Sequence, residues 1–579
     1  FGQEDYSLND VTVRYSSCDG SQVPYPIQHT DGKAGAATRS LRINPHRLHL
    51  GLTGLVLLKE DGEEVSLTDL KKIKQQLNLW TGLLESSYEI EGVPVTVGVY
   101  AHQDHDAISA YIASPLITQA RLKIRFLFPY ASECHTCAGY TWNDGAKHTT
   151  AIVSSSANMA VLKRELDSTV YYVQASWKDQ GIFSETSDQH AFTLTPSTAK
   201  ESFEFTVGFD REKTDAPLPD YRETKSNNEA LWKKFWTEGA AVDFSRCTDP
   251  RARELERRVV LSQYLTKIQC AGSLPPQETG LTMNSWHGKF HLEMHWWHGV
   301  HFALWNRAAL FERSMPWYSK VLGKARATAT WQGYQGARWQ KMTDPEGNES
   351  PSGIGVFLIW QQPHPIYYAE LLYRENPARQ TIDKYKDIVF STADFMASFA
   401  KLNEQDKKYH LCHPIIPAQE IFKPIETDDP AFELAYWHYA LSVAQQWRER
   451  AGLAPDPTWQ AVLDNLAPLP VKDGLYLPVA TVPDAYTDHQ YRNDHPSVTA
   501  AYGCLPLTHG MDTAIMARTF DEIMKKWNWQ TTWGWDYPML AMTAARLGKP
   551  EKAVEALLMD VQKNMYLVKR HNYKDQRLR

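Results

Sequence analysis

The 579-residue sequence predicts an N-terminal antiparallel β-sandwich, a short helical linker and a C-terminal closed toroid of paired helices. Three observations lead to this fold class. Short β-branched or alternating apolar runs fill the first 215 residues, a polar segment with two prolines follows at 211–228, and helical patterns dominate from residue 249 onward. A chain of this length exceeds one hydrophobic core, so two or three domains are expected.

Residues 1–215 contain strand-like runs, separated by turns rich in Asp, Gly, Asn and Ser. Because no helical pattern lies between the runs, antiparallel pairing in a sandwich is favoured over a parallel sheet with crossover helices. Few clusters of catalytic residue types occur here, so we interpret the region as a support domain. The runs cover residues 11–17, 48–59, 94–102, 107–114, 120–130, 149–154, 169–177, 190–196 and 201–209.

The linker, residues 216–248, contains a short helix at 228–240 with three aromatic residues on one side. Asp249 and Pro250 then supply the N-cap and the first turn of a helix that ends at Gly272. Polar and aromatic residues fall in the connections between later helices, which predicts a closed toroid over residues 249–579 with one loop-rich face. These later helices are predicted over residues 378–400, 430–451, 458–466, 512–527, 537–547 and 549–563.

The composition excludes some classes of partner. The net charge is -7 and the chain has no basic tract, which argues against nucleic acid. No apolar run reaches about 18 residues, so no membrane span is predicted. The 12% aromatic fraction and the 20 Trp favour a protein that binds carbohydrate or peptide on aromatic surfaces.

Among the seven cysteines, only Cys134 and Cys137 lie close together in sequence. One such pair is weak evidence for zinc, which requires four ligands. We interpret the two as a structural pair or as two free thiols, and we expect no metal site.

Residues 284–307 (NSWHGKFHLEMHWWHGVHFALWNR) hold four Trp, five His, a Lys and a Glu. A core-facing helix stripe is made of Leu, Ile and Val, whereas here flat aromatic faces alternate with hydrogen-bonding groups. This mixture suits a ligand with apolar C–H faces and many hydroxyls, namely a sugar. A Trp-rich buried core with satisfied histidines is the alternative interpretation.

Three later regions carry similar residues. The loop 331–365 is rich in Trp, Gln and Gly, and the loop 413–422 places Glu420 in a proline-bounded apolar segment. Apolar surroundings favour a protonated carboxyl group, which a general acid working near neutral pH requires. The third region combines residues 494–497 with residues 533–537 and contains His495, Trp533 and Asp536.

Each candidate also has a simpler explanation. Glu349 fits a solvated loop acid, Glu293 fits a helix-surface acid, and Asp494 and Asp536 fit helix N-caps. The recurrence of carboxylates and tryptophans in loops that would share one face of a toroid favours a catalytic site over these separate explanations.

The order of the parts and several motifs resemble glycoside hydrolase family 65 (the kojibiose and maltose phosphorylases and acid trehalases). Residues 288–293 (GKFHLE) are similar to the family's Gly-x-x-x-x-Asp segment, whose acid holds the sugar in the −1 subsite. Residues 417–420 (PAQE) fall where the phosphorylases carry Gly-Pro-Asp-Glu, the segment of the general acid. Residues 336–339 and 347–349 also resemble the family's intervening segment.

A second resemblance is to the bacterial 1,2-α-L-fucosidases. Residues 291–297 (HLEMHWW) are similar to their Asn-Thr-Glu-Met-Asn-Tyr-Trp segment, and residues 495–497 (HPS) and 502–503 (YG) are similar to their His-x-Ser and Tyr-Gly. Together the resemblances imply that the toroid is an (α/α)6 barrel, that Glu420 is the general acid and that Glu293 contacts the −1 sugar.

Two departures from these families affect the expected chemistry. The phosphorylases place a Ser-Ser pair for phosphate near a late helix, where this chain has Gly534-Trp535-Asp536. An Asp there would repel phosphate and could deprotonate a water, which favours hydrolysis. In addition, Glu293 stands where the phosphorylases have Asp and His291 where the fucosidases have Asn, so the sugar pocket is expected to be reshaped.

We therefore expect an inverting glycoside hydrolase acting on an α-linked sugar, with Glu420 as acid and Asp536 as base. The two carboxyl groups of such an enzyme stand about 6.5–9.5 Å apart. Asp575 is an alternative base, and because the sequence stops at Arg579 without a clear final helix, a truncated barrel and a base beyond it are further alternatives. The residues expected to bind substrate are Trp286, Lys289, His291, Glu293, Trp331, Trp339, Glu349, Trp360, His495 and Trp533.

Other functions remain open at this stage: a phosphate-dependent disaccharide phosphorylase, a catalytically inactive carbohydrate-binding protein, or a polysaccharide lyase on a similar toroid. The expected partner is an oligosaccharide or glycoside, no cofactor is expected, and a homodimer is possible because many relatives are dimers. The absence of an initial Met at Phe1, with the resemblance to bacterial carbohydrate enzymes, favours a periplasmic or secreted protein whose leader is missing.

Overall fold

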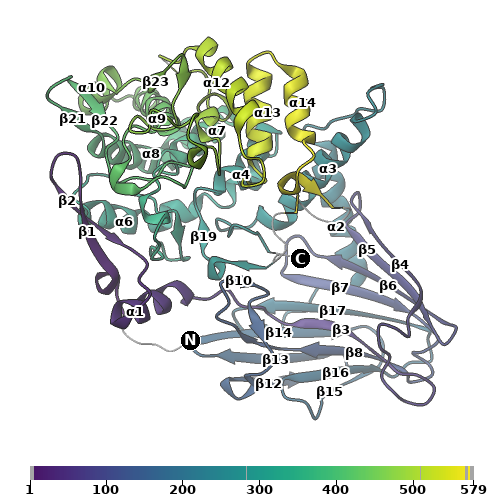
Figure 1. The fold of residues 1–579 in the computed structure, drawn as a ribbon. Helices are drawn as coiled ribbons and strands as arrows, with labels where there is room; N and C mark the ends of the chain where they lie inside the picture. Colours follow the sequence, from purple (N-terminus) through teal and green to yellow (C-terminus); the bar gives the residue numbers. More distant parts are fainter. Residues whose placement is uncertain (1–5, 282, 509, 568–571, 574–579) are drawn as a thin grey trace. The chain divides into compact units, whose positions relative to one another are not determined.

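The computed structural model describes residues 6–281, 283–508, 510–567 and 572–573, which belong to two compact units (Figure 1). Of the described residues, the sheet unit contains 47–134 and 138–239, and the helical unit contains those within 6–46, 135–137 and 240–573. The predicted division into a β-rich part followed by a helical part is therefore confirmed in outline.

The sheet unit is an antiparallel sandwich. Its larger sheet has the strand order β12-β13-β14-β17-β7-β6-β5-β4 and its smaller sheet the order β15-β16-β8-β3. The strands are β3 (Leu52–Leu57), β4 (Lys71–Asn78), β5 (Leu83–Ile90), β6 (Val93–Ala101), β7 (Ala107–Ala113), β8 (Leu122–Leu127), β12 (His148–Ser155), β13 (Met159–Leu166), β14 (Thr169–Trp177), β15 (Gly181–Glu185), β16 (Ala191–Pro196) and β17 (Ser202–Asp210).

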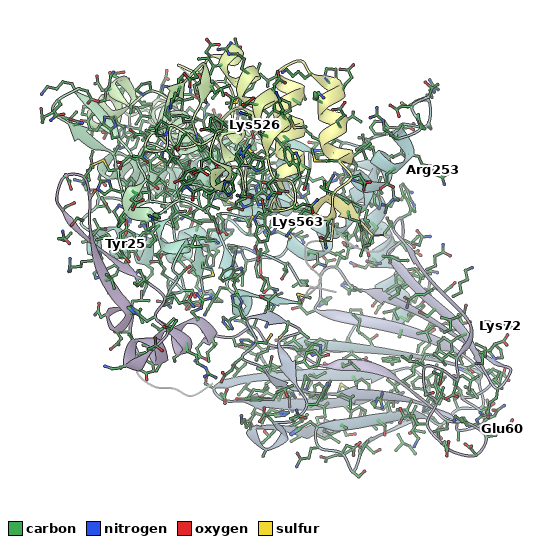
Figure 2. All side chains as sticks on the ribbon, viewed as in Figure 1. Tyr25, Glu60, Lys72, Arg253, Lys526 and Lys563 are labelled. Atoms are coloured by element: carbon green, nitrogen blue, oxygen red, sulfur yellow. A yellow bond between two sulfur atoms is a disulfide. The ribbon has the colours of Figure 1, made fainter. Side chains whose placement is uncertain are left out.

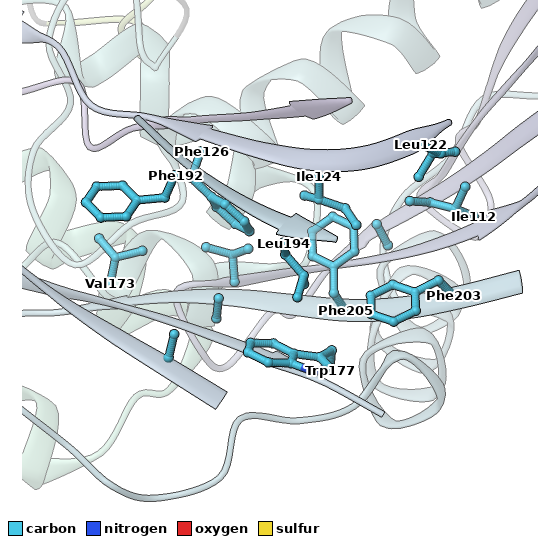
Figure 3. Close-up of a cluster of buried hydrophobic side chains, with 14 of the residues drawn as sticks. Ile112, Leu122, Ile124, Phe126, Val173, Trp177, Phe192, Leu194, Phe203 and Phe205 are labelled. Atoms are coloured by element: carbon cyan, nitrogen blue, oxygen red, sulfur yellow. The ribbon is translucent and has the colours of Figure 1, made fainter. Parts of the chain in front are cut away.

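Buried side chains from both sheets form the core between them (Figure 3). Phe126 of β8 meets Phe205 of β17 edge-to-face, with their ring centroids 6.4 Å apart. Alternate residues of β8 are buried, as expected for a strand with one face on the core. The sequence pattern missed β4, because all eight of its residues are exposed and it therefore lacks a core-facing apolar row.

Helix α2 (Tyr221–Thr237) belongs to the sheet unit and packs on β6 and β7. Asp220 caps it by accepting a hydrogen bond from the backbone N–H of Glu223, whose side chain accepts one from Asp220 in return. This capping box starts the helix seven residues earlier than the predicted residue 228. The helix expected inside the predicted linker at 216–248 is therefore present, and it covers Tyr221–Thr237.

The helical unit also contains the N-terminal hairpin of β1 (Thr12–Ser16) and β2 (Gln22–Pro26) and the helix α1 (Gly32–Ile43). The ring of Tyr25 (labelled in Figure 2) lies 4.8 Å from that of Phe357, and Gln332 donates a hydrogen bond to the carbonyl of Pro24. The prediction placed residues 1–215 in the sandwich, whereas the described residues 6–46 belong to the helical unit. The sequence could not show this, because a short hairpin fits the strand pattern in either unit.

The remaining helices of this unit pack mainly on their neighbours in sequence, such as α7 on α8, α8 on α9 and α13 on α14 (Figure 1). The helices predicted over residues 378–400, 430–451, 458–466, 512–527 and 537–547 are present within a few residues, and the helix predicted over 549–563 ends earlier, at Leu558. The helices are α3 (Ala252–Cys270), α4 (His295–Leu304), α5 (Ala308–Glu312), α6 (Pro316–Trp331), α7 (His364–Glu375), α8 (Arg379–Phe399), α9 (Ala431–Arg450), α10 (Pro457–Asn465), α11 (Ala500–Gly503), α12 (Thr513–Lys526), α13 (Asp536–Arg546) and α14 (Pro550–Leu558).

A disulfide joins Cys18, in the β1–β2 turn, to Cys412. Cys134 and Cys137, for which a structural pair and free thiols were both open, are each disulfide-bonded. Within the part of the chain that the structure describes, no helix is both long and apolar enough to cross a bilayer.

Candidate active site

The candidate site begins with a strained turn that presents Trp286. Trp286, His287 and Gly288 have successive φ values of 50°, 58° and 81°. Positive φ is uncommon for residues other than glycine, and two such residues in a row mark a turn that its surroundings must hold in place. The indole Nε1–H of Trp286 donates to Glu278 Oε2 over 3.0 Å, so the turn fixes a half-buried aromatic ring beside a carboxylate.

A short two-stranded ladder brings the next residues together. β19 (Phe290–His291) pairs with β20 (Met342–Thr343), and the N–H of Leu292 donates to the carbonyl of Lys341 over 2.8 Å. As a result the ammonium of Lys341 lies 3.4 Å from Glu293 Oε1. It also lies 3.3 Å from Glu420 Oε1, on a different loop.

The Lys341 ammonium therefore joins the two predicted carboxylates in one ion cluster. Since both oxygens contact the same nitrogen, they are at most about 7 Å apart. Glu293 is nearly inaccessible, with 4% of its side chain exposed, whereas Glu420 retains 28%. The carboxylate open to solvent is thus the one predicted to be the acid.

Charges and burial act in opposite directions on this cluster. Burial disfavours the ionised form of Glu293, but attraction to Lys341 and His291 outweighs it, so the pKa of Glu293 is lowered. Burial likewise opposes the charge on Lys341, yet Glu420, Glu293 and Glu278 together raise the pKa of its ammonium. Glu293 is therefore an anion and Lys341 a cation near neutral pH.

His291 completes this side of the cluster. Its Nδ1 lies 3.1 Å from Glu293 Oε1, and its side chain is completely buried. Among the residues that the structure describes, neither His291 Nε2 nor Glu293 Oε2, both buried, has a hydrogen-bond partner. Two such atoms on adjacent side chains leave hydrogen-bonding capacity that hydroxyl groups of a ligand would satisfy.

The loop that carries Glu420 is fixed from behind. Gln419 is completely buried, and its side-chain amide donates to the carbonyls of Tyr491 and Asn493 over 2.8 and 3.0 Å. The backbone N–H of Glu420 donates to Asp494 Oδ2 over 2.9 Å. These bonds hold the backbone of Glu420 against the loop that contains His495.

His495 and Asp536 form a buried imidazole–carboxylate pair, with Nδ1 and Oδ1 2.8 Å apart. The second oxygen of Asp536 accepts a hydrogen bond from the backbone N–H of Trp533, and the residue is completely buried. Both carboxylate oxygens therefore contact protein groups, and the carboxylate fixes the orientation of the His495 ring.

The imidazole of His495 carries a stabilised charge. Burial disfavours that charge, but Asp536 and Asp494 outweigh it and raise the pKa of His495 to about 8. Its Nε2 lies 3.6 Å from Asp494 Oδ1, which also accepts a hydrogen bond from Trp533 Nε1–H. The ring stacks on half-buried Trp535 with the centroids 4.0 Å apart, and Trp535 stacks on Trp360.

Three predicted substrate-binding residues have other partners, and a fourth lies at the end of a helix. The ammonium of Lys289 donates to the backbone carbonyls of Asn44 and Pro45, and the indole of Trp339 donates to Thr392 within the core. Trp331 is the last residue of α6. Glu349 is buried 3.6 Å from Arg338, so it is not a solvated loop acid.

Sequence reasoning missed Lys341, and it treated Asp494 only as a possible cap. A lysine in a loop is ordinarily solvated, and no local pattern marks this one as buried. The sequence feature that could have pointed to Lys341 as a site residue is its position between two segments that resemble family 65, residues 336–339 and 347–349. Asp575 lies outside the described residues.

A cavity outside the candidate site carries less chemistry. A cavity of about 640 Å³ in the sheet unit is bordered by residues such as Tyr172, Gln174 and Phe209, and it contains none of the predicted site residues. Within residues 6–281, 283–508 and 510–567, no group of three or more His, Cys, Asp or Glu could hold a metal ion.

Neither a protein-family model nor a curated protein sequence matches this chain. Among solved structures, a protein from the human microbiome, provisionally described as a kojibiose phosphorylase, is similar over 88% of this chain and 75% of its own, with 11% identity and a TM-score of 0.66. A bacterial glucoamylase complexed with acarbose covers 71% of this chain and 60% of its own, with 11% identity and a TM-score of 0.41.

A family 92 α-mannosidase from Bacteroides thetaiotaomicron covers 89% of this chain and 72% of its own, with 10% identity and a TM-score of 0.36. The two lower scores carry no argument here. The first similarity confirms, at the level of fold, the resemblance to the kojibiose phosphorylase family that the motifs indicated.

Proposed function

We propose that this chain is an inverting glycoside hydrolase built on an (α/α)6 barrel, and that Glu420 is its general acid. The observation that carries the proposal is the ion cluster in which one ammonium joins a buried carboxylate, Glu293, to a partly exposed one, Glu420. The buried anion with His291 suits binding of sugar hydroxyls, and the exposed carboxyl suits proton transfer to the leaving oxygen.

For the base, we keep Asp536 in a modified role. The buried carboxylate fixes the imidazole of His495, as the buried Asp of a catalytic triad fixes its His. In this proposal the neutral form of the His495 imidazole, whose share grows as the pH rises through about 8, accepts the proton of the attacking water at Nε2. The water oxygen bonds to the anomeric carbon, and Glu420 protonates the departing oxygen. Asp575 is the alternative base.

The charges near Glu420 favour hydrolysis over phosphorolysis. Glu293, Glu420, Asp494 and Asp536 lie in contacts that include two cationic groups, Lys341 and His495. A further dianion would be repelled by the excess of negative charge. The alternatives are a phosphate-dependent phosphorylase and a carbohydrate-binding protein without activity.

An assay of sugar release from a panel of α-linked disaccharides, with and without inorganic phosphate, tests the proposal. We expect turnover without phosphate and a product of inverted anomeric configuration by NMR. Glu420→Gln should reduce turnover by at least about 10²-fold while substrate binding remains. A strict phosphate requirement, or unchanged turnover in Glu420→Gln, would overturn it.

We also propose that the protein works in the periplasm or outside the cell. Disulfides persist in oxidising compartments, and Cys18 is bonded to Cys412. Alkylation of free thiols in protein taken directly from its native cells tests this, since a reduced Cys412 would contradict it.

A further inference from the structure

We propose that Lys341 is a positioning residue that sets the spacing of the two carboxylates, Glu293 and Glu420, by holding its ammonium against both. This inference rests on the proposed function, because it assigns those carboxylates to the reaction. Lys341 matches no motif of the two families that the sequence resembles, and its part in the site follows from the geometry alone.

The position of Lys341 is set by its backbone. It directly precedes β20, whose Met342 is the register partner of His291, and its carbonyl accepts the N–H of Leu292. The ladder thus fixes the Cα of Lys341 opposite the residue before Glu293. Only the side chain has to extend toward Glu420.

The side chain is confined as well. A Cβ on Gly355 would stand 2.9 Å from Cδ of Lys341, so the absence of a side chain at 355 leaves the room that the aliphatic stem occupies. At its far end the ammonium lies 5.4 Å from the centroid of Trp286, within cation–π range. With 9% of the side chain exposed, Lys341 has little freedom to leave the carboxylates.

The charge of Lys341 has a consequence for each carboxylate. It keeps buried Glu293 ionised, so that Glu293 accepts hydrogen bonds from sugar hydroxyls. It also anchors one oxygen of Glu420 and leaves the other to face the leaving group. The groups that interact electrostatically with Glu293 are Lys341, His291, His298, His364 and Tyr368.

A direct titration of Glu293 tests this role without requiring turnover. In protein labelled with ¹³C at the Glu carboxyl carbons, the signal of Glu293 is identified by its loss in Glu293→Gln. Lys341→Met should raise the pKa of Glu293 by about 1–3 units, because an opposite charge at this distance is removed. In Lys341→Arg, which keeps the positive charge, the pKa of Glu293 should stay close to its value in the unmodified protein. An unchanged Glu293 pKa in Lys341→Met would overturn the proposal.

Lys384→Met is the matched control. Lys384 pairs with Glu312 over 2.7 Å, but half of its side chain is exposed, so its loss should leave the titration of Glu293 unchanged. If Lys384→Met changed the pKa of Glu293 by as much as Lys341→Met does, the proposal would also be overturned, because the effect would then not be specific to Lys341.

Kinetics on p-nitrophenyl α-glycosides provide a second measurement. We expect kcat to fall about 10²-fold in Lys341→Met and to recover partly in Lys341→Arg, since misplacing a catalytic group by about 1 Å has such an effect. A kcat unchanged in Lys341→Met would overturn the role. If the unmodified protein hydrolyses none of the glycosides, the proposed function fails, while the titration still decides the role of Lys341.

Discussion

At the scale of single residues, the site is a set of charges that burial alone would neutralise. Glu293, Lys341 and His495 are all buried, yet each is held in its ionised form by a partner of opposite charge. Burial of a charge is costly unless it is paired and hydrogen-bonded, so each of these residues depends on its neighbours for its state.

This dependence predicts how stability changes with pH at His495. Its pKa is raised from 6.5 to about 8 on folding, so its contribution is fully present below pH 6.5 and is lost as the pH rises through about 8. The shift corresponds to about 2 kcal/mol. The unfolding free energy of the unmodified protein, relative to that of His495→Asn, should therefore fall by about this amount between pH 6 and pH 9 in urea titrations.

If the unfolding free energies of the unmodified protein and of His495→Asn depended on pH in the same way, the stabilising charge could not be assigned to His495. Asp536→Asn is the companion variant, because it removes the partner and leaves the imidazole. In Asp536→Asn, most of the pH-dependent part of the unfolding free energy that His495 contributes should be lost. The acidic limb of the pH–rate profile should also move toward lower pH.

At the scale of elements, Glu420, the proposed acid, lies on a loop whose conformation is fixed by side chains behind it. Gln419 joins the Glu420 loop to residues 491–493, and Glu433 at the start of α9 accepts the N–H of Ala418 over 2.7 Å. Binding residues on loops supported by packed helices are a common arrangement, because loops vary freely while their supports stay rigid.

Gln419→Met tests this support. The substitution nearly conserves the side-chain volume but removes the amide group that donates to the carbonyls of Tyr491 and Asn493. Because these buried acceptors lose their hydrogen bonds, we expect a loss of about 2 kcal/mol in unfolding free energy. Turnover should also fall about 10-fold or more, since the Glu420 backbone would shift. Chemical denaturation and initial rates measure the two effects.

Gln490→Met serves as the comparison for Gln419→Met. Gln490 is exposed and bonds its neighbour Asp488, so little change is expected in stability or turnover. Equal effects of the two substitutions would show that the buried bonds of Gln419 do not fix the loop.

The elements also show what could be predicted from the sequence. Helices such as α8 and α9 carry long apolar patterns and were predicted within a few residues, because their buried faces repeat with the helical period. Helix α4 was not, since its His and Trp residues, two buried and three half-buried, do not form the Leu, Ile and Val stripe by which an amphipathic helix is recognised. Trp286, Glu293 and Glu420 could be found from motifs, whereas Lys341 could not, because its partners lie 48 and 79 positions away.

At the scale of the whole molecule, segments far apart in sequence assemble the helical unit. The N-terminal hairpin packs beside Phe357, and the Cys18–Cys412 disulfide spans 394 positions. Cys412 lies eight residues before Glu420, so the hairpin is bonded covalently to the start of the loop that carries the proposed acid. The sequence gives no rule for pairing these two cysteines, because connectivity cannot be deduced from spacing alone.

Removing this disulfide should therefore weaken both the unit and the site. The variant Cys18→Ser/Cys412→Ser is expected to lose about 2–5 kcal/mol of unfolding free energy, because the unfolded chain is no longer constrained by the cross-link. The start of the Glu420 loop would retain its backbone bonds to Asp428 and Asp429. We therefore expect turnover at low temperature to fall less than stability does.

Thermal unfolding and rates at 15 °C measure the two effects. The comparison is Cys247→Ser, a change at an exposed free cysteine. A double variant as stable as Cys247→Ser would mean that the hairpin is held by packing alone, through contacts such as that of Tyr25 with Phe357.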